Sequence, residues 1–222
     1  MFEVTNELVG RIEEVLGRGL CKGKGDPSKQ MCVEAAVCFA MGLPHGDNPP
    51  CVGGAVRIFK MTLNDSRWSS DLVRAGGVRK IAIAQLGSNT LGQIEFARRL
   101  SEKTIRILIP TLFREVFKDN EACLKAADLC EISDTLEGAA RADYAAYAAD
   151  YAAAAAYGAA RAATYAARGS ADASAARAAY AAGAVARVNS DKYLILSAEL
   201  CFQVLDEMNS PGAVWMRENN WQ

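Results

Sequence analysis

Glycine and lysine alternate in one short stretch near the start of the chain, GLCKGKGDP at residues 19–27. Glycine lets a backbone approach a ligand closely, and neighbouring lysine charges favour an anion. The stretch lacks the Gly-x4-Gly-Lys-Ser/Thr spacing of a Walker A loop, and no strand pattern precedes it. We therefore expect Lys22, Gly23, Lys24 and Gly25 to bind an anionic ligand. The alternative is a surface turn that its lysines keep soluble.

A second candidate group lies in AVRIFKMTLNDSRWSS, residues 55–70. Arg57 and Lys60 are three residues apart on a predicted helix, so they share one face, and Asn64 continues that face. Asp65 and Trp68 follow in a loop. Two cations, an amide and an aromatic plane are what a nucleotide's phosphate and base would use. In the alternative interpretation, Trp68 anchors the core and the two polar residues cap the helix.

His45 is the only histidine, and it lies in the proline-rich loop LPHGDNPP. Asp47 could orient its imidazole as a general base, and Cys51 or Cys21 could then act as a nucleophile. No signature of a thiol hydrolase surrounds either cysteine. The alternative is a loop histidine bonded to a carbonyl. We expect His45 and Asp47 to help bind the ligand, and a small hydrolase or lyase that uses His45, Asp47 and Cys51 is an alternative function.

Three cysteines and the histidine could be imagined as a zinc site. Cys32, Cys38, His45 and Cys51 are separated by six, seven and six residues, which matches no familiar zinc pattern. Cys32 and Cys38 would also lie about 240° apart around a helix. Buried free cysteines behave as small apolar residues. We therefore expect neither a metal nor a cofactor.

The elements that must position these residues are predicted to be helices. Strand signals are nearly absent, and apolar residues recur at helical spacing. The chain is therefore predicted to be all-α, a compact multi-helix bundle followed by long alanine-rich helices. The predicted helices cover residues 4–16, 32–41, 52–63, 70–86, 91–117 with a bend at Pro110, 121–132, and 191–208.

Residues 139–187 contain 28 alanines and are predicted to be helical, because alanine loses no side-chain entropy in a helix. Breaks are expected at Gly169–Ser170 and Asn189–Ser190. Tyr144, Tyr151 and Tyr165 share one heptad register, which favours a helix–helix seam with nearby Arg–Asp pairs over base stacking by these tyrosines and arginines. Such a seam would form a hairpin or a homo-oligomer. The tail with Trp215 and Trp221 is expected to dock.

Charge and composition limit the possible partners. Residues 1–118, the predicted globular domain, carry 17 Lys/Arg against 12 Asp/Glu, whereas the alanine-rich region 119–222 carries 8 against 14. This asymmetry is too small for duplex nucleic acid. No signal peptide or membrane segment is evident, and seven cysteines, an odd number, indicate reduced thiols. We expect a cytoplasmic protein, which binds no membrane and packs residues 119–222 on the first domain or on another subunit.

Residues 15–118 resemble a group of bacterial and phage proteins, through GLCKGKGDP, CVEAAVCFAMGLPHGDNPPCV and RIFKMTLND. The resemblance implies a variable alanine-rich tail and supplies no reaction. Small phage proteins of this sort include sponges that sequester nucleotide signals of bacterial immunity. The expected function is therefore non-catalytic sequestration of a small anionic, nucleotide-derived ligand in the host cytosol. The alternatives are the enzyme described above and a helical interaction protein.

Overall fold

The computed structural model describes residues 2–132 and 171–221. In these two ranges the chain is all-α, as predicted, and the only strand-like features are two isolated bridges, Leu20–Met31 and Gly25–Met31. The predicted tyrosine seam and the break at Gly169–Ser170 lie outside the described residues.

The first two helices begin at polar side chains that cap their free backbone N–H groups. Helix α1 (Asn6–Gly17) follows Thr5, whose hydroxyl accepts a hydrogen bond from the N–H of Leu8 at 3.2 Å. Helix α2 (Val33–Ala40) follows Cys32, whose sulfur accepts a hydrogen bond from the N–H of Ala35 at 3.4 Å. Nearly all of α2 is buried, so its thiol cap replaces the usual hydroxyl in an apolar setting.

The next pair of helices frames the loop that carries Trp68. Helix α3 (Gly54–Asn64) begins two residues later than the pattern of residues 52–63 predicts. Helix α4 (Asp71–Ala84) lies within the predicted range 70–86 and begins after Ser70, whose hydroxyl accepts a hydrogen bond from the N–H of Val73 at 3.1 Å.

The predicted long helix over residues 91–117 is interrupted by a π-helical turn. Helix α5 (Gln93–Lys103) runs into the π segment Thr104–Leu108, and α6 (Ile109–Val116) continues from it. Pro110 is the second residue of α6. A proline ring clashes with the carbonyl four residues back in an α-helix, and the wider turn lies directly before it. The sequence therefore predicted an irregularity, although its centre is one turn earlier than Pro110.

Two shorter elements complete the middle of the chain. A 3-10 turn (Ser88–Thr90) precedes α5, and α7 (Glu121–Ile132) has the predicted bounds. Helix α7 packs against α6, where Arg114 donates hydrogen bonds to Asp128, at 2.8 Å, and to Glu131.

Helix α10 (Ala171–Glu207) is continuous, so the predicted break at Asn189–Ser190 is wrong. Asparagine and serine are only moderately poor helix formers, costing about 0.5 kcal/mol each relative to alanine. Asp191 does not begin a new helix. Its carboxylate instead accepts hydrogen bonds from the N–H of Ser69, at 3.0 Å, and from the Ser69 hydroxyl. Tertiary contact therefore outweighs the local stop signal.

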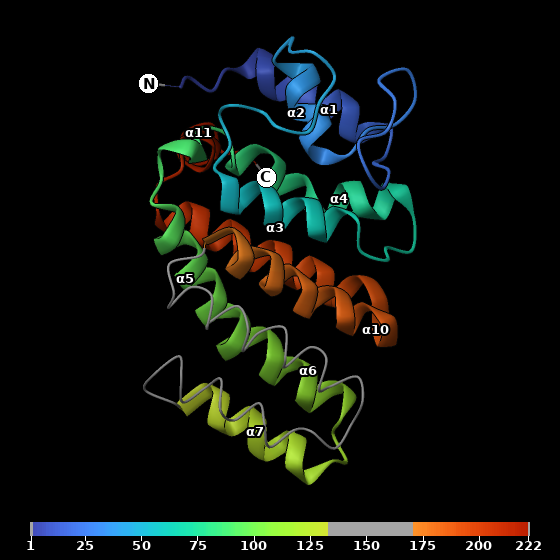
Figure 1. Cartoon of the computed structure of the whole chain (residues 1–222), viewed down its shortest axis with the longest axis vertical. Helices are drawn as coiled ribbons and strands as arrows, with labels where there is room; N and C mark the ends of the chain where they lie inside the picture. The colour runs from blue at the N-terminus through green and yellow to red at the C-terminus, as the bar shows by residue number, and fades with distance from the viewer. Residues whose placement is uncertain (1, 133–170, 222) are drawn as a thin grey trace.

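The helices stack in successive layers, with α1 and α2 at one end, α3 and α4 beneath them, then α10, and α6 with α7 at the far end (Figure 1). Helix α10 packs against α3, α4 and α5. One apolar cluster therefore includes residues on both sides of residue 118, among them Ile12, Val37, Phe59, Ile81, Phe96, Leu108, Tyr193, Leu200 and Val204.

The C-terminal tail docks, as predicted. Helix α11 (Pro211–Glu218) packs on α4, and the N–H of Gly212 donates to the carbonyl of Leu86 at 2.8 Å. Trp221 is half-buried, and the guanidinium of Arg79 lies over its ring at 4.2 Å.

In the described part of the chain, no helix combines the length and the apolar character needed to cross a membrane.

Candidate functional site

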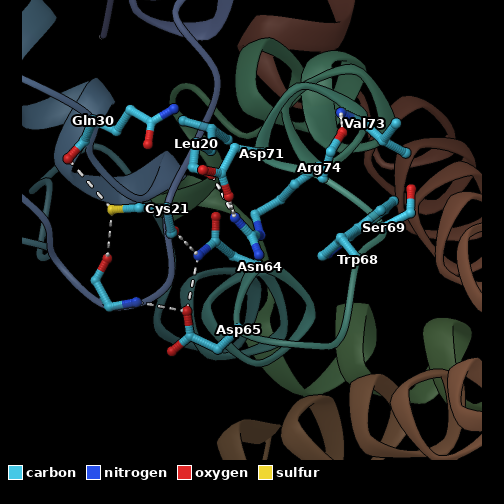
Figure 2. A network of polar contacts seen from close by, with 12 residues as sticks. Leu20, Cys21, Gln30, Asn64, Asp65, Trp68, Ser69, Asp71, Val73 and Arg74 are labelled. Atoms are coloured by element: carbon cyan, nitrogen blue, oxygen red, sulfur yellow. Dashed lines mark hydrogen bonds and ion pairs between the residues drawn. The ribbon is translucent and has the colours of Figure 1, made fainter.

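The glycine–lysine loop is folded onto the ends of α3 and α4 by hydrogen bonds (Figure 2). The Asn64 amide donates to the carbonyl of Cys21 at 2.8 Å, and the Asp65 carboxylate accepts from the N–H of Gly23 at 2.9 Å. From α4, the guanidinium of Arg74 donates to the carbonyl of Leu20. The structure therefore brings the predicted residues Gly23, Asn64 and Asp65 together, and they bond to one another.

Two of the loop glycines differ in what requires them. Gly25 has φ +72°, and a Cβ there would lie 2.2 Å from the carbonyl oxygen of Gln30 and 2.5 Å from the sulfur of Cys21. Gly23 has φ +60° but open space around it. Glycine at position 25 is therefore required by the packing of the loop on itself. Close approach of a ligand is not needed to explain it.

The charged members of the loop point outward. Lys22 and Lys24 are exposed, as is His45. The His45 Nε2 lies 3.0 Å from the carbonyl oxygen of Gly25, which is the hydrogen bond to a carbonyl that the sequence offered as the alternative to catalysis. His45 thus braces the loop from the side of the proline-rich segment.

The structure does not assemble the predicted catalytic group. Cys51 is 3% exposed, and burial raises the pKa of its thiol, so it stays protonated and weakly nucleophilic. Burial, and to a smaller extent the charges of Glu34 and Asp47, raise the pKa of the Cys32 thiol to about 11. Cys21 is half-buried, its sulfur contacts the carbonyls of Gly23 and Gln30, and burial raises its thiol pKa as well.

Lys60 lies inside the core and is not available to a phosphate at the surface. Its ammonium is 3.2 Å from the carboxylate of Glu34, and both side chains have no exposed area. Burial lowers the pKa of Lys60 and raises that of Glu34, because the core disfavours either charge, while their mutual attraction opposes both shifts. Of the expected cation pair, only Arg57 reaches the surface: it is half-buried, and its guanidinium lies 3.7 Å from the sulfur of Met61.

Trp68 anchors the core, which corrects its expected role as a stacking platform. Its side chain is 6% exposed, and its Nε1 donates to the carbonyl of Leu63 at 2.9 Å. The ring fills the space beside Gly77, where a Cβ would lie 2.4 Å from it.

A cationic groove lies elsewhere, along α5 and the π segment beside the end of α10. It has a volume of about 440 Å³, which is within the usual range for small-ligand sites. We call it the α5 groove. It is lined by Arg98, Arg99, Glu102, Lys103, Arg106, Ile107 and Glu207.

Ion pairs hold the side chains of the α5 groove in place. Arg98 and Arg99 both donate to Glu95, and these hydrogen bonds lower the pKa of that carboxyl to about 2. Lys103 lies 2.8 Å from Glu207 of α10, and Arg106 lies 3.3 Å from Glu102. The four cations of the lining face three carboxylates, Glu102, Glu207 and the adjoining Glu95, so the groove carries one positive charge in surplus.

The sequence contains a signal for this groove, although none of its residues is among the expected site residues. In EFARRLSEKTIRIL, Arg99, Lys103 and Arg106 recur at spacings of four and three, which places three cations on one helical face. The surrounding glutamates make this stretch resemble an ordinary solvated helix. Only the π turn and the approach of α10 make it a groove.

Comparison with known proteins gave no match to any family model, curated protein or solved structure. Among the described residues, no group of three or more His, Cys, Asp or Glu side chains is placed to hold a metal ion. The function is therefore argued from the geometry of the chain itself.

Proposed function

We propose that the protein binds a small anionic ligand, and that the ligand occupies the α5 groove. The observation that carries the proposal is the set of four cations, Arg98, Arg99, Lys103 and Arg106, around one hollow of about 440 Å³. Arginine forks match the oxygens of a phosphate in pairs, and lysine adds a mobile point charge. Ile107, which is 39% exposed, gives the uncharged part of a ligand an apolar contact.

A nucleotide-derived ligand is the class that we propose. Its phosphates would lie among the four cations, and its base could stack on a guanidinium plane, since arginine stacks on aromatic faces. This assignment moves the phosphate contacts away from Lys60 and the base contact away from Trp68, because both of those side chains are buried.

Binding without turnover is supported by the chemistry of the lining. The α5 groove is lined by arginine, lysine, glutamate and isoleucine, and Glu95 beside it stays ionised down to a pH of about 2. Among the described residues, the lining contains no cysteine, serine or histidine, the side chains that nucleophilic and acid–base catalysis most often use. Sequestration of a signal nucleotide, in the manner of a phage sponge, is the setting that the resemblance of residues 15–118 would give it.

The test is to mix the purified protein with a panel of cyclic and linear nucleotides, remove unbound ligand, denature, and identify what is released by mass spectrometry. We expect an intact nucleotide in stoichiometric amount, and loss of that nucleotide in Arg99→Gln/Lys103→Gln. The matched control is Arg11→Gln/Arg18→Gln, which removes two exposed, ion-paired arginines from α1. A chemically altered nucleotide would overturn the non-catalytic proposal, and equal release from both variants would overturn the site.

A further inference from the structure

Glu207 differs from the other carboxylates around the α5 groove in where it comes from. Glu95 and Glu102 belong to α5 itself and pair with arginines three or four residues away. Glu207 is the last residue of α10, and it reaches across to Lys103 at 2.8 Å and to Arg99 at 3.9 Å. One carboxylate from a second helix therefore lies between two cations of the groove.

These contacts are weak enough to exchange. The side chains of Arg99, Lys103 and Glu207 are 37%, 21% and 45% exposed, respectively. Ion pairs between side chains this exposed contribute about 0–1 kcal/mol to stability, so breaking them costs little. A carboxylate carries one negative charge, whereas a phosphate monoester carries about two, a diphosphate carries at least as many, and both present more acceptor oxygens.

The geometry points to Glu207 as an internal competitor whose carboxylate is replaced by a phosphate group when the ligand binds. This inference rests on the proposed function, and it narrows the ligand class to phosphate monoesters and diphosphates. A simple carboxylate offers no more charge than Glu207 already supplies, so it does not displace it. Removing the charge of Glu207 frees Lys103 and leaves Arg99 paired with Glu95 alone, which strengthens binding of the ligand.

The experiment titrates inorganic pyrophosphate and, separately, acetate by isothermal calorimetry into the wild-type protein, Glu207→Gln, Glu199→Gln and Arg99→Gln/Lys103→Gln. Glu199 is the matched control, because it lies on the same helix, is 38% exposed, and pairs with Lys80 of α4 at 3.3 Å, away from the groove. We expect Glu207→Gln to bind pyrophosphate roughly tenfold more tightly than the wild type, as loss of one like charge a few ångströms from a polyanion should. Glu199→Gln should stay within about twofold, and acetate should not bind the wild type.

The outcomes separate this inference from the proposed function. If pyrophosphate binds the wild type, is lost in Arg99→Gln/Lys103→Gln, and binds Glu207→Gln no more tightly, then Glu207 is no competitor while the groove remains the site. An equal gain in Glu199→Gln would likewise overturn the inference, since it would show a general charge effect. If neither the wild type nor Glu207→Gln binds pyrophosphate, both proposals fail.

Discussion

The glycine–lysine loop and the α5 groove differ in how well their residue types indicate a binding site. The loop contains residue types that suggest a ligand site in a sequence. In the fold, several of them hold the loop together: Gly25 packs closely on the backbone of Gln30, and the carboxylate of Asp65 accepts a hydrogen bond from the N–H of Gly23. The groove is built from arginines, lysine and glutamates that look like an ordinary helix surface. The unusual composition of the loop therefore reflects how the loop packs. The better candidate for an anion site, the α5 groove, consists of residue types that are common on helix surfaces.

The largest expected effect tests whether Lys60 is structural. Lys60→Met leaves the carboxylate of Glu34 buried without a partner, which should cost about 3–5 kcal/mol of unfolding free energy. Chemical denaturation measures it. The double variant Glu34→Leu/Lys60→Met removes both charges and should recover most of that loss. A single variant as stable as the wild type would contradict the burial of this pair.

Next in size is a contrast between two glycines of the loop. Gly25→Ala should lose about 2–4 kcal/mol, because its Cβ meets Gln30 and Cys21 and its φ is +72°. Gly23→Ala has the same type of backbone strain but open space, so about 1 kcal/mol is expected. Thermal unfolding of the two variants side by side checks the difference. Equal losses would mean that the loop does not pack as described.

A smaller effect is expected where the groove is neutralised. Arg99→Gln/Lys103→Gln removes exposed ion pairs with Glu95 and Glu207, and should change the unfolding free energy by less than about 1 kcal/mol. Denaturation under the same conditions as for the glycine variants measures it. A loss as large as that of Gly25→Ala would make the groove a structural network and remove the contrast between the two regions.

The smallest effect is a pH dependence. Hydrogen bonds from Arg98 and Arg99 lower the pKa of Glu95 from 4.5 to about 2 in the folded protein. Because the folded pKa lies below the unfolded one, this contribution to stability is complete above about pH 4.5 and is lost as the pH falls toward 2. Glu95→Gln should therefore show a shallower loss of stability between pH 5 and pH 2 than the wild type does. Identical slopes in acid denaturation would contradict the bonding of Glu95.

The sequence predicted the helices well, because helix signals are local. The bounds of α7 match the prediction, and α4 begins within one residue of it, because spacing and capping involve residues close in the chain. The docking of the tail was predicted from its tryptophans. The prediction of a break at Asn189–Ser190 failed because the carboxylate of Asp191 is hydrogen-bonded to Ser69, more than a hundred residues away. Such a contact leaves no mark in a local pattern.

The candidate site was predicted less well, for a related reason. Spacing correctly placed Asn64 and Asp65 at the end of α3, yet it could not show that their side chains hold the glycine–lysine loop, or whether Lys60 and Trp68 face solvent or core. A helix face is defined by spacing, but its surroundings depend on which elements cover it. The α5 groove needs Glu207 from α10 and the π turn, and neither is visible in the spacing of Arg99, Lys103 and Arg106.

We propose that anions bind at the α5 groove and not at the glycine–lysine loop. The most direct test is calorimetric titration of pyrophosphate into the wild type, Arg99→Gln/Lys103→Gln and Lys22→Gln/Lys24→Gln, which each lose two positive charges from one region. We expect the groove variant to weaken binding at least tenfold, equivalent to about 1.4 kcal/mol, and the loop variant to bind within about twofold of the wild type. The reverse result, with binding lost only in the loop variant, would place the anion site at the loop and contradict binding at the α5 groove.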